Sequence, residues 1–117
     1  MPKTAERWTV EAGDADVATL VVPPVLRRTR VVDIDVRLQA RVVEAGPAAW
    51  LALRVEVDGR LEWTRRIEAR APVDSLDHHC RRTLGPGRAL RVLATAQLGG
   101  TVGERLTIEV QEADEAG

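Results

Sequence analysis

The segment SLDHHCRRT, residues 75–83, contains both histidines and the single cysteine of this 117-residue chain. Imidazole and thiolate groups are common zinc ligands, and together they can also act as the base and nucleophile of a covalent catalyst. If the segment is a strand, His78 and Cys80 share one face, with Cα atoms roughly 6.5 Å apart, near enough to bind one ion. The stretch Asp77-His78-His79-Cys80 is therefore the candidate metal site.

The number of ligands argues against that site. Zinc takes at least three protein ligands and usually four in structural sites, and the chain has no other histidine or cysteine. The missing ligands would have to be carboxylates, and Asp74 and Asp77 are nearest in sequence. A Cys-His catalytic pair also lacks an identifiable orienting group and oxyanion donors. We therefore expect a polar loop or edge strand here, without a cofactor.

Two pairs of carboxylates, Asp14 with Asp16 and Asp33 with Asp35, raise the same question for calcium. Calcium takes six to eight oxygen ligands, of which one pair supplies only a fraction. Asp33 and Asp35 alternate with apolar residues in a predicted strand, and Gly-Asp-Ala-Asp is ordinary turn chemistry. A solvated sheet face and a turn are the simpler interpretations.

Alternation with a period of two residues runs through most of the chain and predicts the elements that position these groups. It is clearest over residues 30–43, where the apolar side chains at even-numbered positions from Val32 to Val42 share one face. Further strands are indicated at residues 7–12, 17–22, 50–57, from 60 onward, 88–98 and 104–110, with a weaker one at 79–84. About eight strands and no helix predict an all-β single domain, an antiparallel β-sandwich whose form could be a jelly roll. A small β-barrel is the alternative, and residues 1–5 and 112–117 are expected to fray.

The turn at Asp58-Gly59 decides which residues of the following strand face inward. A two-residue turn would place Val55 opposite Glu62, whereas a three-residue loop from Val57 to Gly59 would pair apolar with apolar residues. Favourable cross-strand pairs contribute roughly 0.2–1 kcal/mol each. The sequence therefore favours the three-residue loop, with Leu61 and Trp63 inward and Trp50 beside Arg66 outward.

Arg65 and Trp50 break the predicted alternation. Arg65 falls on the same side as Trp63 and Ile67, where a charge is costly unless it is paired. Either the sandwich is open there or a second chain covers it. Trp50 falls on the polar side, where its indole could stack on the guanidinium of Arg66 or anchor a partner. Trp50, Arg65 and Arg66 are therefore the candidate binding residues.

Composition excludes several classes of function. The net charge of −1, from 17 basic and 18 acidic residues with interspersed signs, lacks the basic excess of nucleic-acid-binding proteins. No apolar run approaches the ~20 residues of a membrane span, and the N-terminus has no apolar segment typical of a secretory signal. The single cysteine fits a reducing compartment, so we expect a cytoplasmic protein. None of the common catalytic or nucleotide-binding motifs occurs.

These observations predict a non-catalytic interaction or assembly module that binds itself or another protein through a sheet face or edge. The first alternative is a small-ligand or carbohydrate-binding sandwich, with Trp50 or Trp8 in a groove. The second is a metal-binding protein that uses His78, His79 and Cys80 to hold zinc, with Asp77 as a further ligand.

Overall fold

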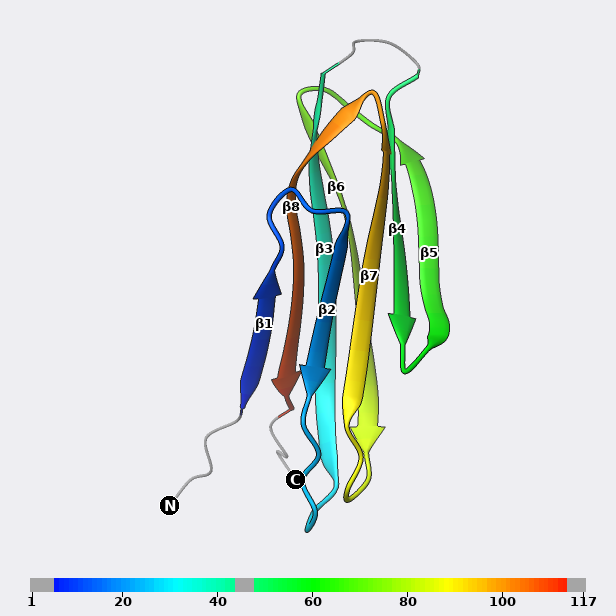
Figure 1. The fold of residues 1–117 in the computed structure, drawn as a ribbon. Coiled ribbons are helices and arrows are strands. Elements are labelled where there is room, and N and C mark those ends of the chain that lie inside the picture. Colours follow the sequence, from blue (N-terminus) through cyan, green and yellow to red (C-terminus); the bar gives the residue numbers. More distant parts are fainter. Residues whose placement is uncertain (1–5, 44–47, 114–117) are drawn as a thin grey trace.

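The computed structural model describes residues 6–43 and 48–113, which form two four-stranded antiparallel sheets. Sheet A has the strand order β1-β8-β3-β6, and sheet B has the order β2-β7-β4-β5 (Figure 1). The strands are β1 (Arg7–Glu11), β2 (Val17–Val22), β3 (Arg30–Val42), β4 (Trp50–Val57), β5 (Arg60–Glu68), β6 (Val73–Leu84), β7 (Leu90–Gly99) and β8 (Thr101–Glu112). The sheets are not closed into a barrel, so the predicted eight-stranded β-sandwich is confirmed. The described residues contain no helix, and hence none that could cross a membrane.

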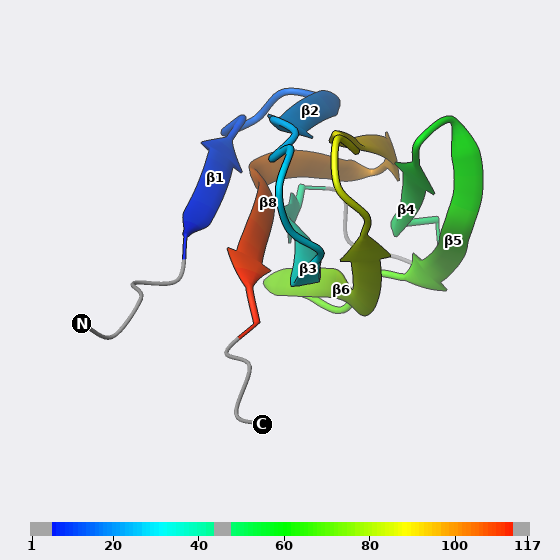
Figure 2. The same ribbon diagram turned by 90° about the horizontal axis from the view of Figure 1, so that it is seen from below.

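Aliphatic side chains pack between the two sheets and form the core. In β3 the even-numbered residues from Val32 to Ala40 are buried, and in β4 the odd-numbered residues from Leu51 to Val57 are buried. Buried residues of β7 and β8 follow the same alternation. Viewed along the strands, the two layers face each other across this core (Figure 2). Period-two patterning thus places one apolar face of each sheet against the other.

Strands β5 and β6 end their sheets on the same side of the sandwich. Backbone ladders run within each sheet, from β6 to β3 and from β5 to β4, and none joins β5 to β6 among the described strands. Arg65 lies opposite Leu53 in the ladder, so it belongs to the inner side of β5, yet it is exposed. An open edge therefore accounts for the arginine that the sequence places on an apolar face.

Two strands are longer than the sequence indicates. β6 begins at Val73 instead of residue 79, and β8 runs from Thr101 to Glu112 instead of from 104 to 110. The long β3 explains both extensions, because it offers ladder partners along its length to β6 and β8. Glu112 was expected to fray, but it is 8% exposed and paired with Arg28. Residues 1–5 and 114–117 lie outside the described part of the chain.

The predicted three-residue loop before β5 is wrong. Asp58 and Gly59 both have positive φ, 51° and 80°, and form a two-residue turn that pairs Val57 with Arg60. A β-bulge follows, in which Glu62 is the extra residue and Val55 pairs with Trp63. The bulge removes the apolar-polar mismatch that counted against the short turn. Leu61 consequently lies opposite Glu56 on the outer face and is 52% exposed.

The left-handed conformation at Gly59 gives a testable prediction. Gly59→Ala should lower the free energy of unfolding by about 1–2 kcal/mol, because a Cβ is disfavoured at positive φ. Gly85→Ala is the matched control, since Gly85 is not among the glycines with positive φ and its added Cβ would lie 4.0 Å from the nearest atom, on Arg88. Urea unfolding of both variants measures the difference. Equal losses would contradict this account of the turn.

Candidate functional site

The inner face of β6 changes from apolar to polar in the middle of the strand. Leu76 and Leu84 are buried, and the three inner positions between them hold His78, Cys80 and Arg82. His78 lies opposite Val36 and Cys80 opposite Ile34 in the ladder with β3, and both β3 residues are buried. The expectation that His78 and Cys80 share one face is therefore confirmed.

Glu62 of β5 completes a three-residue cluster across the open edge. Its Oε2 lies 3.0 Å from Nε2 of His78, and its Oε1 accepts a hydrogen bond from Arg82. The nearest ligand atoms of Glu62, His78 and Cys80 all lie within 4.8 Å of one another. The sequence pointed to Asp74 and Asp77 as the nearest carboxylates. Glu62 was missed because the predicted three-residue loop places it opposite Arg54 on the outer face, whereas the observed turn has two residues.

Asp77 and His79 point to the outer face of sheet A, away from the cluster. Nδ1 of His79 lies 2.9 Å from Oδ1 of Asp35, and Arg81 donates from its Nε to Asp33 over 2.8 Å. This hydrogen bond from Arg81 lowers the pKa of Asp33. The stretch Asp77-His78-His79-Cys80 therefore does not converge on one ion, because neighbouring residues of a strand face opposite sides.

Ring stacking orients His78, and hydrogen bonding and burial determine the protonation of Glu62 and Cys80. The rings of Trp63 and His78 stack with centroids 4.7 Å apart and planes 13° apart. The hydrogen bonds of Glu62 with His78 and then with Arg82 lower the pKa of its carboxyl. Burial raises the pKa of the Cys80 thiol, and the negative charge of Glu62 adds to that effect. Near neutral pH the cluster thus holds a carboxylate beside a protonated thiol.

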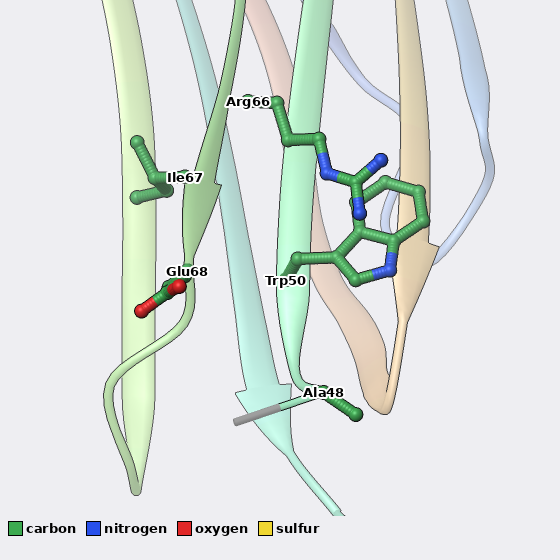
Figure 3. A pocket seen from close by; sticks show the side chains of 5 residues that line it. All are labelled: Ala48, Trp50, Arg66, Ile67 and Glu68. Carbon is green, nitrogen blue, oxygen red and sulfur yellow. The ribbon is translucent and has the colours of Figure 1, made fainter. Parts of the chain in front are cut away.

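The second candidate site surrounds Trp50 on the outer face of sheet B. The guanidinium carbon of Arg66 lies 3.8 Å from the centroid of the indole ring, so the predicted stacking is present, although the ladder sets Arg66 opposite Ala52 and Trp50 opposite Glu68. The indole rests on Gly99, where an added Cβ would lie 2.0 Å from Nε1. A shallow pocket beside this stack is lined by Ala48, Trp50, Arg66, Ile67 and Glu68 (Figure 3). Arg65 is not among these residues.

The outer faces of the two sheets differ in charge. The outer face of sheet A carries the ion pairs Arg7–Glu109, Arg105–Glu11 and Arg81–Asp33, and the contact of His79 with Asp35. The outer face of sheet B exposes aliphatic side chains on both of its marginal strands. Val17 and Val21 of β2 are 53% and 57% exposed, and Leu61 of β5 is 52% exposed. Between these margins lie the uncharged Leu93, Thr95 and Ala52, but also Arg91 and the ion pair of Arg54 with Glu56. The outer face of sheet A also exposes valines, Val73 at 42% and Val102 at 43%, so the faces differ in how many charges accompany the exposed aliphatic side chains.

Comparison with known proteins gives the fold alone. No family model matches the chain, and no curated protein resembles it in sequence. Among solved structures it is similar to dimeric latent PorU from Porphyromonas gingivalis, with 13% identity, a TM-score of 0.61 and coverage of 92% of this chain and 12% of that one. It is also similar to the mosquito-larvicidal Cry4Aa toxin from Bacillus thuringiensis, with 10% identity and a TM-score of 0.53. The match covers 93% of this chain and 21% of the toxin chain. The chain thus spans a small part of either protein.

The Trp50–Arg66 stack predicts a measurable coupling. In a double-mutant cycle of Trp50→Leu and Arg66→Met, we expect a coupling free energy of about 0.5–1 kcal/mol, as for other exposed cation–π pairs. Arg54→Met replaces Arg66→Met in the control cycle, because Arg54 lies in the same strand as Trp50 but pairs with Glu56. Thermal or urea unfolding gives the energies. A coupling of zero for Arg66, or an equal one for Arg54, would show that the stack contributes nothing specific.

Proposed function

We propose that this protein is a non-catalytic interaction module that associates with a second copy of itself through the outer face of sheet B. We interpret its strand order as two Greek keys forming a jelly roll, which exposes one broad face of each sheet. The proposal concerns which of these faces binds.

The observation that carries the proposal is the unequal character of the two outer faces. Paired charges keep a surface hydrated and poor at excluding water, and the outer face of sheet A carries more of them than that of sheet B, where Arg54 pairs with Glu56. Val17, Val21 and Leu61 on sheet B expose aliphatic area that association would remove from water, at roughly 25 cal/mol per Å². Trp50 adds an aromatic side chain already held in place by Gly99 and Arg66, which suits an anchor at an interface.

The charges on sheet B favour a second copy over an unrelated partner. Arg54 and Glu56 form an ion pair at 3.7 Å, and Arg66 and Glu68 alternate in the same way on the neighbouring strand. A copy related by a two-fold axis meets the same surface in reverse order, which can bring an arginine opposite a glutamate. Such a face is complementary to itself.

The mass in solution tests this proposal. We expect a dimer by light scattering during gel filtration, and Val17→Glu, opposite the uncharged Thr95, should shift it to monomer, because a buried unpaired carboxylate opposes association. Val102→Glu is the control, since Val102 is 43% exposed but lies on the outer face of sheet A. A wild-type monomer, or the same response from both variants, would overturn the proposal.

Binding of a small ligand is the second candidate, supported by the pocket beside Trp50. The guanidinium of Arg66 covers a face of the ring, so a sugar cannot stack there without displacing it. A carboxylate-bearing sugar could instead pair with Arg66. This alternative predicts a saturable change in tryptophan fluorescence when uronic-acid oligosaccharides are added, with loss of the response in Arg66→Met. No response from the wild-type protein would contradict it.

A further inference from the structure

We propose that Glu62, His78 and Cys80 bind one zinc ion, or a similar divalent transition metal, at the open edge between β5 and β6. The site differs from the one that the sequence suggests, because its ligands come from both sheets and exclude Asp77 and His79. In this site the metal links the last strand of sheet A to the last strand of sheet B.

The first argument is the composition of the β6 inner face. Polar groups on a core-facing surface lose hydration and need compensation. The contacts among Glu62, His78 and Arg82 compensate those three groups. They give no role to the Cys80 thiol, although it lies within 4.8 Å of the ligand atoms of Glu62 and His78. A metal ion explains why all three side chains converge.

The geometry requires little rearrangement. Two ligand atoms at 2.0–2.1 Å from a tetrahedral ion lie roughly 3.3 Å apart. Nε2 of His78 and Oε2 of Glu62 are 3.0 Å apart, close to that separation. The stack with Trp63 holds the His78 ring, and Glu62 already contacts Nε2 of that ring. The Sγ of Cys80 lies within 4.8 Å of the ligand atoms of both residues, so a small closer approach completes three ligands.

Charge and ligand type favour zinc over calcium or magnesium. One thiolate, one carboxylate and one neutral imidazole balance a divalent cation exactly in formal charge, and the thiol proton is released on binding. Sulfur and nitrogen ligands suit zinc, whereas calcium and magnesium require oxygen. Arg82 occupies Oε1 of Glu62 and leaves Oε2 for the ion, as outer partners of metal-binding carboxylates do.

The fourth coordination position would be open to water. The side chains of His78 and Glu62 are each 18% exposed, so solvent reaches the cluster. No backbone ladder joins β5 to β6 among the described strands, and a metal would add to the contacts that Glu62 makes with His78 and Arg82 across these two edges. The ion should stabilise the folded protein, since the unfolded chain does not hold the three ligands together.

Cobalt titration of the reduced protein tests the site, because cobalt(II) bound to a thiolate absorbs in the near ultraviolet. We expect this band to saturate at one equivalent and to disappear when zinc is added. Cys80→Ser should abolish the band, and His78→Gln and Glu62→Gln should each weaken binding at least tenfold. His79→Gln is the matched control and should bind as the wild type does, since His79 faces the opposite side of the strand.

A thermal readout covers the case in which one variant fails to fold. Zinc should raise the melting temperature of the wild type and of His79→Gln, but not that of Glu62→Gln, which keeps the cysteine. Absence of the cobalt band and of any zinc-induced shift in the wild type would overturn the proposal. So would a band that is unchanged in both His78→Gln and Glu62→Gln, because the thiolate would then bind cobalt alone.

Discussion

Aliphatic packing between two sheet faces holds this protein together, and the backbone ladders of the described strands run only within each sheet. β3 and β8 pack their buried valines, leucines and isoleucines against those of β4 and β7, while each ladder stays in its own layer. This arrangement stabilises the middle of the sandwich and leaves its sides without ladder contacts. Polar residues are tolerated at those sides because water remains within reach. The edge between β5 and β6 is one of these sides. The inward-facing Arg65 and the cluster of Glu62, His78 and Cys80 both lie along it.

One extra residue in β5 determines the chemistry of that edge. Without the bulge at Glu62, the two-residue turn would place Glu62 opposite Val55, and Trp63 would face outward beside Arg54. With it, Trp63 faces inward to stack on His78, and the Glu62 carboxylate reaches the same ring. The bulge thus brings the Trp63 ring to the side on which the imidazole, the carboxylate and the thiol already lie.

The sequence was sufficient for the features that depend on neighbouring residues. Alternation along β3, β4 and β7 predicted their faces, and the two-residue spacing of His78 and Cys80 predicted that they share one. It failed for Glu62 and Leu61, because the register of β5 depends on a bulge whose energy comes from contacts with β4. The proximity of Glu62 to His78 also depends on β5 and β6 lying on one side of the sandwich. Strand order is set by the whole fold, and no local pattern reveals it.

The strand order also bears on how the chain folds. Of the ladders in the described structure, the β4–β5 hairpin is the one that joins strands adjacent in sequence, closed by Asp58 and Gly59. The other ladders join distant segments, and β1 pairs Arg7 with Gln111 near the opposite end of the chain. Closing such long loops costs entropy before any contact repays it, so a topology of this kind folds slowly. The β4–β5 hairpin, which carries Glu62, can form early because its strands are adjacent in sequence. Strand β6, which carries His78 and Cys80, pairs with the distant β3 and therefore forms its ladder only after a long loop has closed.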